Sequence, residues 1–575
     1  MIPRLRPACW LLLAFCGASF GCRRDAASQN ARTTAQPASS PSPRDDTPAV
    51  TTAAWFVDVA QSAGIRFVPR NGQEAGHCSI LESLGVGVAL FDYDGDGQLD
   101  LFVPGGGEFG PNHDIRGLRP ALFRHAGDWH FTEVTGPAGL AEAQFYSHGA
   151  VVGDYDGDGF PDLLITGYHG LYLYHNQGDG TFTEVSHQAG LSHDTWSTSA
   201  AWGDLDGDGN LDLYLVNYVD WSFDNDPVCG SSRHQRDVCS PTQFNAVPHR
   251  FFLGNGDGTF RDASQEVGLV EGGKGLGVVA ADVDLDGHLD FYVTNDTTPN
   301  LLYHNDGHGH LQEIGLISGT AFSDTATADG SMGVDLGDYN LDGLPDLWVA
   351  NFEDQTFALY RNEGNCVFQH VSGLTGISRT RGLYVGFGTV FFDFDLDGDE
   401  DIFVATGHVM YDPKNSSTRQ HPLLFENLAG KQFVNVASQA GPYTQDVHVG
   451  RGVAVGDLDD DGRPDLAVSH TNEPIALLRN ESKTAGHWLR GRLIGTRSQR
   501  DAGGARVRVQ TGDRSQIRQV KGGSSFLSSS DPRLMFGLRD ARTVDVLEIA
   551  WPSGAKQTLR DVAVDQTVVV VEPAP

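Results

Sequence analysis

The chain has 575 residues and a formal net charge of −35 at pH 7. So acidic a chain lacks the basic footprint that a phosphate backbone requires, which argues against nucleic acid as a partner. The length would suit three or four ordinary domains, but a single large β domain built from repeats can also absorb several hundred residues.

The N-terminus has the features of an export signal. Arg4 and Arg6 precede an apolar run of 11 residues, which is too short to cross a bilayer and is typical of a signal core. The run ends just before Cys22, which follows the small residue Gly21. Residues 1–22 resemble a bacterial lipoprotein signal. We expect an exported cell-envelope lipoprotein whose only membrane contact is a lipid at Cys22, with ordinary cleaved secretion as the alternative.

Residues 23–54 are rich in Ala, Ser, Thr and Pro and show no apolar periodicity, so we predict a disordered tether. Two of the later cysteines, Cys229 and Cys239, lie ten residues apart in one insert. We expect them to pair in an oxidising compartment. Cys78 and Cys366 either pair or stay free.

One short pattern, D-x-[DN]-x-D-G-x-x-D followed by an apolar run, recurs seven times along the chain. We call the seven copies Asp loops 1 to 7. Successive copies begin 50 to 78 residues apart. A single copy is a weak signal, whereas seven copies indicate a repeat architecture. They begin at Asp92, Asp154, Asp204, Asp282, Asp338, Asp393 and Asp457.

The spacing within an Asp loop predicts a calcium site. Carboxylates at positions 1, 3 and 5 of a tight loop can converge on one point, and the glycine at position 6 allows the sharp turn. Position 7 varies freely, as expected if it offers its backbone carbonyl, and the aspartate at position 9 would close the cage. Hard oxygen donors suit calcium better than magnesium, which demands stricter octahedral geometry.

We therefore predict about seven calcium ions, one for each loop. The fifth loop has an asparagine at position 3, and its lower charge predicts weaker binding. The predicted ligands are Asp92, Asp94, Asp96 and Asp100; Asp154, Asp156, Asp158 and Asp162; Asp204, Asp206, Asp208 and Asp212; Asp282, Asp284, Asp286 and Asp290; Asp338, Asn340, Asp342 and Asp346; Asp393, Asp395, Asp397 and Asp401; Asp457, Asp459, Asp461 and Asp465.

These loops differ from EF-hands, which need a glutamate at position 12 and flanking helices. Each joins two short apolar runs typical of buried strands. Between the loops stand another apolar strand, a glycine-rich turn and a Phe-x-x-Val-like strand. Four strands in each unit predict an all-β fold, with a seven-bladed β-propeller over residues 55–480 and a small β domain over residues 487–572.

The order of the segments predicts how the ring closes. Phe-x-x-Val-like strands begin at Phe56, Phe131, Phe182, Phe260, Leu311, Phe368 and Phe433, and none follows the seventh loop. The seventh blade thus lacks an outer strand, and the strand at Phe56 is left over. We predict that residues 56–59 pair with residues 475–478 and remove an open sheet edge.

The C-terminal domain has alternating, half-buried strands over residues 506–509 and 544–549. From Glu481 onward the chain carries 15 Lys and Arg against 10 Asp and Glu. This mild basicity leads to the hypothesis that the domain docks on the acidic propeller.

The Asp loops and their glycine-rich turns resemble FG-GAP-type (VCBS-type) repeats, the calcium-binding propeller repeats also seen in integrin heads. The C-terminal segments resemble the ASPIC/UnbV domain, and together the two parts resemble the cartilage acidic protein 1-like family. The resemblance implies extracellular calcium binding with roles in adhesion or matrix contact, and no catalytic activity. The segments that carry the second resemblance are residues 487–489, 500–505, 522–527, 533–538 and 551–554.

The sequence leaves the role of the metal open. Calcium either staples each blade or, less favoured, presents an open coordination position to a partner. The favoured function is a binding, adhesion or scaffold protein whose partner is an unidentified protein or glycan at the cell surface. The alternative is an enzyme acting on a polysaccharide or small molecule at the propeller face, for which catalytic motifs give little support.

Three histidines and one long insert are further candidates for a functional role. His125, His175 and His304 lie in blade turns, where a polar surface role is favoured over metal ligation. The insert at residues 219–249, which contains Trp221, is either a disulfide-stapled surface loop or a loop that binds a partner.

Overall fold

The computed structural model describes residues 54–142, 145–230, 236–484 and 486–574. The predicted signal over residues 1–22, the lipid anchor at Cys22 and nearly all of the predicted tether lie outside the described residues. Within the described part of the chain, no helix is long and apolar enough to cross a membrane.

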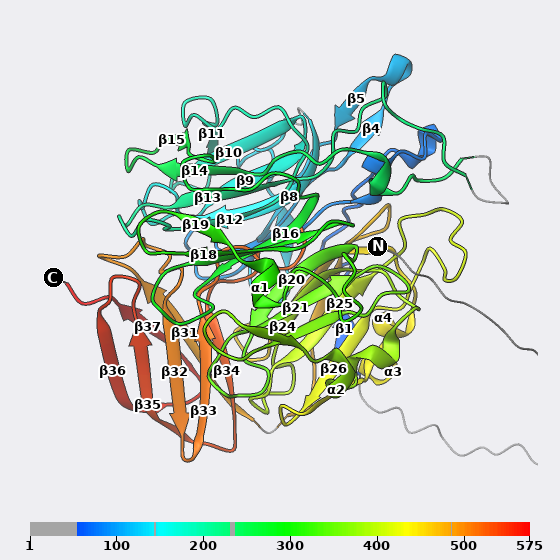
Figure 1. The fold of residues 1–575 in the computed structure, drawn as a ribbon. Helices are drawn as coiled ribbons and strands as arrows, with labels where there is room; N and C mark the ends of the chain where they lie inside the picture. The colour runs from blue at the N-terminus through cyan, green and yellow to red at the C-terminus, as the bar shows by residue number, and fades with distance from the viewer. Residues whose placement is uncertain (1–53, 143–144, 231–235, 485, 575) are drawn as a thin grey trace, which may run out of the picture. The chain divides into compact units, whose positions relative to one another are not determined.

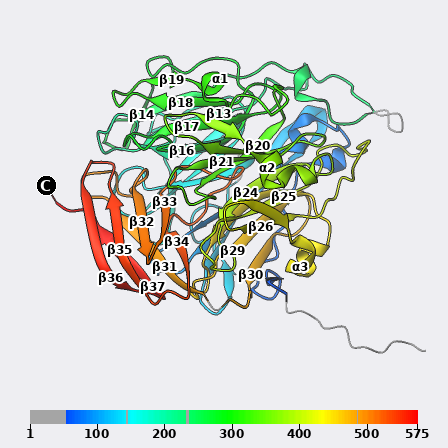
Figure 2. The same ribbon diagram turned by 60° about the horizontal axis from the view of Figure 1, so that its bottom comes forward.

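Seven four-stranded antiparallel sheets form the blades of a β-propeller, which confirms the predicted fold (Figures 1 and 2). The first strands of successive blades contact one another, so they lie innermost. Blades 1 to 3 comprise β2 (Ala89–Phe91), β3 (Asp100–Val103), β6 (Ala121–His125) and β7 (Phe131–Glu133); β8 (Tyr146–Gly153), β9 (Asp162–Tyr168), β10 (Gly170–Asn176) and β11 (Phe182–Glu184); β12 (Ser197–Gly203), β13 (Asp212–Asn217), β14 (Arg250–Gly254) and β15 (Phe260–Asp262).

The remaining blades repeat this order. Blades 4 to 7 comprise β16 (Gly275–Ala281), β17 (Asp290–Asn295), β18 (Leu301–Asn305) and β19 (Leu311–Glu313); β20 (Ser331–Gly337), β21 (Asp346–Asn351), β22 (Ala358–Asn362) and β23 (Phe368–His370); β24 (Gly386–Phe392), β25 (Asp401–Thr406), β26 (Leu423–Leu428) and β27 (Gln432–Asn435); β28 (Gly450–Gly456), β29 (Asp465–His470), β30 (Ala476–Asn480) and β1 (Phe56–Asp58).

The ring closes with the predicted strands, because β1 is the outer strand of blade 7, but β1 pairs with residues 478–480 instead of the predicted 475–478. It pairs antiparallel with β30, with Phe56 opposite Asn480 and Asp58 opposite Leu478. Phe56 is buried, and its ring packs 6.2 Å from that of Phe392 in blade 6. The first strand in the described chain therefore completes the last blade and joins the two ends of the array.

An asparagine near the end of the third strand ties most blades to the preceding one. Asn176 donates its side-chain amide to the carbonyl of Tyr93 in the previous Asp loop, at 2.8 Å. The same contact recurs from Asn305, Asn362, Asn427 and Asn480. These asparagines are buried, so the contact replaces water at both groups and fixes the loop against the neighbouring blade.

Two small sheets follow the propeller. One has the order β34 (Leu534–Arg539), β31 (His487–Ile494), β37 (Gln566–Val571), with β31 and β37 parallel. The other has the order β33 (Arg514–Gln519), β32 (Arg506–Thr511), β35 (Thr543–Ala550), β36 (Lys556–Ala563). The two segments predicted as half-buried strands lie in β32 and β35, and a separate hydrophobic cluster fills this part.

A loop from this C-terminal part enters the centre of the propeller. Residues 522–531, which we call the channel loop, hydrogen-bond to the first strand of every blade. One group from each blade shows this: the backbone N–H of Leu90, Ala150, Ala280, Val334, Thr389 and Val455, and the hydroxyl of Ser199. Phe526 and Leu527 at its tip are fully buried.

The insert at residues 219–249 covers the same hydrophobic cluster as the tip of the channel loop. Trp221 and Val238 from the insert are buried together with Phe526 and Leu527. Cys229 and Cys239 form a disulfide, whereas Cys78 and Cys366 are free. The insert is thus a stapled loop, and Trp221 belongs to the core.

The other elements are short. They are the hairpin β4 (Gly107–Phe109) and β5 (Ile115–Gly117), the 3-10 helices η1 (Gln73–Ala75), η2 (Ile80–Ser83), η3 (Pro111–His113), η4 (Pro241–Gln243) and η5 (Ile377–Thr380), and the helices α1 (Gly315–Ser318), α2 (Ser372–Thr375), α3 (Ala437–Ala440) and α4 (Pro442–Gln445).

Candidate metal sites in the Asp loops

Each Asp loop joins the first and second strands of its blade, as the sequence predicts. In loop 1, Asp92 Oδ2 accepts the N–H of Gly97 at 3.0 Å, and Asp96 Oδ1 accepts the N–H of Gln98 at 3.0 Å. Gly97 has φ +91°, a conformation that favours glycine. Position 1 accepts the position-6 N–H in the other loops as well. In loops 1 and 2 the other oxygen of the position-1 carboxylate has no hydrogen-bond partner, whereas in loops 3 to 7 it accepts a second backbone N–H within the loop.

The aspartate at position 9 has a second task that the sequence did not reveal. Asp100 accepts the backbone N–H of His125 at 2.7 Å and that of Tyr93 at 3.1 Å, so it ties the loop to the third strand. Asp162 and Asp212 make the same pair of contacts. Burial raises the pKa of Asp100 to about 8 and that of Asp162 to about 9. A cation beside these carboxylates would offset the cost of burying them in their ionised form.

Ligand atoms converge in several loops. The groups whose donor atoms lie within 4.8 Å of one another include Asp92, Asp94 and Asp96; Asp154, Asp156 and Asp158; Asp204, Asp206 and Asp212; Asp156, Asp162 and His175; and Asp284, Asp290, His304 and Cys366. Positions 1, 3, 5 and 9 all occur in these groups, so predicted ligands lie together in loops 1 to 4.

Buried carboxylate oxygens without a hydrogen-bond partner show whether these loops suit a cation. Among the residues that the structure describes, Oδ1 of Asp92, Asp154 and Asp459 and Oδ2 of Asp346 are such atoms. A buried, unpaired carboxylate oxygen is costly. These four atoms lie in loops 1, 2, 7 and 5, one in each, and a hard divalent cation held by the oxygens of each loop would pair with its unpaired oxygen, so the donor set fits calcium.

Loop 5 preserves this geometry with a neutral residue. Asn340 Oδ1 accepts the N–H of Asp342 at 3.0 Å, the contact that an aspartate makes in other loops. Its Nδ2 donates to Asp342 Oδ2 at 2.8 Å. This bond occupies a carboxylate oxygen, which is a further reason to expect weaker cation binding in loop 5.

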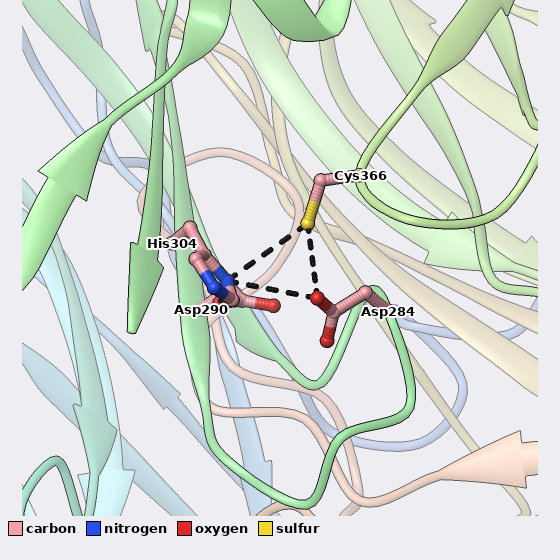
Figure 3. A group of neighbouring side chains, drawn as sticks. All are labelled: Asp284, Asp290, His304 and Cys366. Atoms are coloured by element: carbon pink, nitrogen blue, oxygen red, sulfur yellow. Dashed lines mark hydrogen bonds and ion pairs between the residues drawn. The ribbon is translucent and has the colours of Figure 1, made fainter. Parts of the chain in front are cut away.

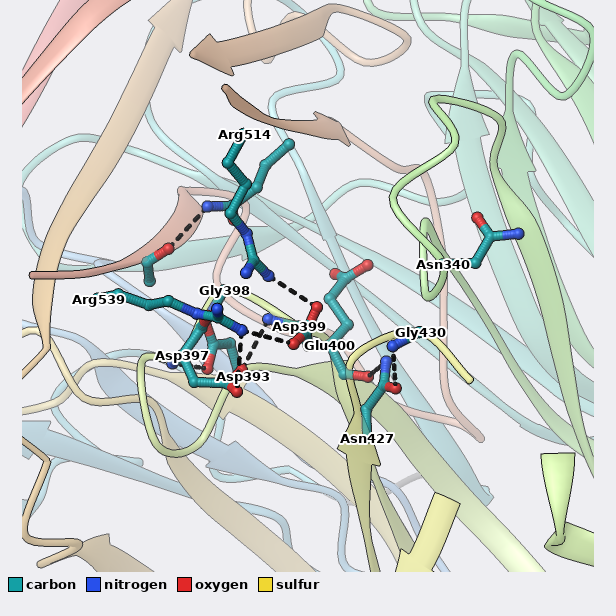
Figure 4. Close-up of polar contacts among 12 residues, drawn as sticks. Asn340, Asp393, Asp397, Gly398, Asp399, Glu400, Asn427, Gly430, Arg514 and Arg539 are labelled. Atoms are coloured by element: carbon teal, nitrogen blue, oxygen red, sulfur yellow. Dashed lines mark hydrogen bonds and ion pairs between the residues drawn. The ribbon is translucent and has the colours of Figure 1, made fainter. Parts of the chain in front are cut away.

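Basic side chains from the C-terminal part reach several loops. Arg514 contacts Asp399 at 2.7 Å and Arg539 contacts it at 3.0 Å (Figure 4). Arg490, which is 5% exposed, contacts the fully buried side chain of Asp457 at 2.9 Å. These ion pairs are the kind of contact that the docking hypothesis predicts between the basic C-terminal part and the acidic propeller. They neutralise part of the propeller's charge from one side.

A cavity of about 350 Å³ lies between the loops and the C-terminal part. Its lining includes the position-1 residues Asp92, Asp154, Asp338 and Asp393. Arg492 and Arg500 line it from the other side. The first aspartates of four loops therefore face a space that they share with arginines.

The expectation of a polar surface role is wrong for one of the turn histidines. His125 is fully buried, and its ring stacks on that of Phe131 with the centroids 4.3 Å apart. Phe131 is the first residue of β7, the outer strand of blade 1. His175 and His304 instead lie part-buried beside the position-9 aspartates, each with Nδ1 near the carboxylate.

The blades and their loops define the class: a β-propeller built from acidic-loop repeats and closed by its N-terminal strand. The chain belongs to the FG-GAP-like repeat family, which matches residues 92–165, 154–215, 237–293, 282–349, 338–404 and 393–468. Residues 495–575 match the ASPIC and UnbV family. The resemblance seen in the sequence is confirmed.

Several known proteins are similar to this chain. Cartilage acidic protein 1 from Mus musculus is 25% identical over 520 residues, which cover 85% of this chain and 73% of that protein. Integrin alpha-6 from Gallus gallus is 29% identical over 109 residues, or 18% of this chain and 10% of that protein. A solved Agrocybe aegerita lectin that recognises terminal N-acetylglucosamine has a TM-score of 0.39 and 16% identity, covering 69% of this chain and 94% of the lectin.

Proposed function

We propose that this protein is an exported, calcium-loaded propeller that serves as a binding, adhesion or scaffold protein at the cell surface. The observation that carries the proposal is the convergence of carboxylate oxygens in the Asp loops, several of them buried and unpaired. Calcium would be held by positions 1, 3 and 5 with a contribution from position 9, and would stabilise each loop by neutralising its carboxylates.

Export is supported by three observations. The sequence begins with a signal-like segment. Cys229 and Cys239 form a disulfide, which is typical of oxidising compartments. The similar proteins include cartilage acidic protein 1, whose name refers to cartilage, and integrin alpha-6. A lipid anchor at Cys22 remains part of the proposal.

The rigid scaffold favours a binding role. The channel loop ties all seven blades together, so the surface loops are presented on a fixed framework. The C-terminal part covers one side of several Asp loops through Arg490, Arg514 and Arg539. These loops then act as structural staples, and a partner would bind on other surface loops of the propeller.

A binding experiment tests this function. The protein without its first 22 residues is passed over immobilised matrix proteins and cell-wall glycans, in calcium and in excess chelator. The proposal predicts saturable binding to at least one surface that is lost in chelator and restored by calcium. Binding that is equally strong in chelator, or no binding to any of these surfaces, would overturn it.

A further inference from the structure

One cluster in blade 4 has a donor set unlike that of the other Asp loops. Asp284 lies in loop 4, Asp290 begins β17, His304 lies in β18, and Cys366 comes from the turn between β22 and β23 of blade 5 (Figure 3). Their donor atoms all lie within 4.8 Å of one another. Residues from two blades thus bring a thiol, an imidazole and two carboxylates to one point.

The distances match those between the ligands of a tetrahedral ion. His304 Nδ1 lies 3.1 Å from Asp290 Oδ1 and 3.7 Å from Asp284 Oδ2. Cys366 Sγ lies 3.3 Å from Asp284 Oδ2 and 3.9 Å from His304 Nδ1. A tetrahedral zinc ion with Zn–S of about 2.3 Å and Zn–N or Zn–O of about 2.0 Å separates its ligands by about 3.3 to 3.6 Å. The observed distances bracket this range.

The surroundings are suited to a bound metal. Asp290 is fully buried, Cys366 is 7% exposed, and His304 and Asp284 are partly accessible from outside. The N–H groups of Asn305 and Val283 hold the two oxygens of Asp290 at 2.9 and 3.0 Å. Such outer hydrogen bonds orient a ligating carboxylate. Partial exposure of His304 and Asp284 leaves a path for an ion to enter.

The place of Cys366 in the repeat is informative. It stands two residues before the first residue of the outer-strand motif, at a position that faces the Asp loop of the preceding blade. Blades 2, 3 and 4 have Gly180, Gly258 and Gly309 there, all with positive φ. Cys366 adopts the same left-handed conformation with φ +56°, which costs a non-glycine residue about 1 kcal/mol. A side chain is retained at this position in spite of that cost.

Blade 1 shows that this position does reach the neighbouring loop. Its equivalent residue, Trp129, donates its indole N–H to Asp459 of loop 7 at 2.9 Å. His175 in blade 2 is the counterpart of His304. It contacts Asp162 at 3.2 Å, and its cluster contains no thiol. The group in blade 4 combines the imidazole with a thiol.

We propose that Asp284, Asp290, His304 and Cys366 form a binding site for a zinc ion. Thiolate and imidazole ligands select zinc over calcium, which prefers oxygen. Binding requires Cys366 as the thiolate and His304 as the neutral imidazole, so zinc displaces protons from both. Asp284 and Asp290 are also two of the four predicted calcium ligands of loop 4, so zinc would replace calcium in this loop and leave the other six Asp loops to calcium. The site goes beyond the proposed function and does not depend on it.

Cobalt provides a direct probe, because a thiolate ligand gives Co²⁺ an intense charge-transfer absorption that oxygen and nitrogen ligands do not. The purified protein, kept in saturating calcium, is titrated with Co²⁺. The proposal predicts one equivalent of tightly bound cobalt with thiolate absorption, which added zinc abolishes. Cys366→Ser should remove this absorption, whereas Cys78→Ser, which alters the other free cysteine of the described residues, should leave it unchanged.

The histidines provide a second matched pair. His304→Gln should weaken cobalt binding at least tenfold, as expected for the loss of a metal ligand, and His175→Gln should not. The melting temperature in calcium identifies any variant that fails to fold. In the unaltered protein, zinc should slow alkylation of Cys366 and leave that of Cys78 unchanged. Absence of thiolate absorption, its survival in Cys366→Ser, or equal alkylation of Cys366 with and without zinc would overturn the proposal.

Discussion

Val334 in the first strand of blade 5 and Ser525 in the channel loop exchange two backbone hydrogen bonds, with N–O distances of 3.0 and 2.6 Å. They lie almost 200 residues apart in the sequence. The pairing places a segment of the C-terminal part among the first strands, where it satisfies backbone groups that face the centre of the ring. The channel loop is therefore expected to contribute to the stability of the propeller itself.

Gly522 tests the fit of the channel loop. A Cβ atom there would lie 1.8 Å from the carbonyl oxygen of Trp202, so Gly522→Ala must displace backbone. We expect a loss of about 1–3 kcal/mol in the free energy of unfolding, measured by chemical denaturation. Gly136→Ala is the control, because a Cβ there meets nothing within 4 Å. Equal effects of the two substitutions would contradict the role given to the channel loop.

Arg490 tests the docking of the C-terminal part on loop 7. Its partner Asp457 is fully buried, so Arg490→Met leaves a buried carboxylate without its cation. We expect a loss of about 3–5 kcal/mol in calcium-free buffer, with a smaller loss when calcium is added. The exposed pair of Arg508 and Glu548 is the control, and Arg508→Met should cost less than about 1 kcal/mol. Similar losses in both variants would refute this account.

The closure of the ring depends on Phe56. Phe56→Ala removes a ring that is 1% exposed and packs on the phenylalanines of blade 6. We expect a loss of about 3–5 kcal/mol, seen as a lower denaturation midpoint. Val569→Ala, at a position that is 56% exposed in β37, should change the midpoint little. A Phe56→Ala protein as stable as the parent would show that β1 is dispensable.

Two buried histidines make stability depend on pH. Burial lowers the pKa of His148 and of His470 to about 4 each, from an ordinary value near 6.5. The neutral form is favoured in the folded state, so the stability that they contribute is complete above about pH 6.5 and falls as the pH drops towards 4. His148→Asn should lose less melting temperature between pH 7 and pH 5 than the parent. A steeper loss in the variant would contradict this assignment.

Much of the fold was readable from the sequence because its signals are local and repeated. The aspartates have the same spacing within all seven Asp loops, and the strand at Phe56 had no blade other than the seventh to complete. The disulfide between Cys229 and Cys239 was also predicted from their spacing.

The rest depended on contacts between distant residues. The small residues around Ser525 give no sign that they enter the propeller, and nothing local links His304 to Cys366 on the next blade. Every Asp loop has an aspartate at position 9. This residue is a candidate metal ligand, and it also accepts a backbone N–H from the third strand of its blade. A spacing pattern alone does not separate the two roles.

The most direct test of the calcium account is to count bound calcium by mass spectrometry after dialysis and to compare thermal melting in calcium and in excess chelator. For protein free of zinc, the account predicts about seven ions, one for each Asp loop, and a large fall in melting temperature in chelator. Asp206→Ala in loop 3 should remove one ion, whereas Asp257→Ala, in an exposed hairpin turn, should remove none. A protein with no bound calcium and the same melting temperature in chelator would contradict the account.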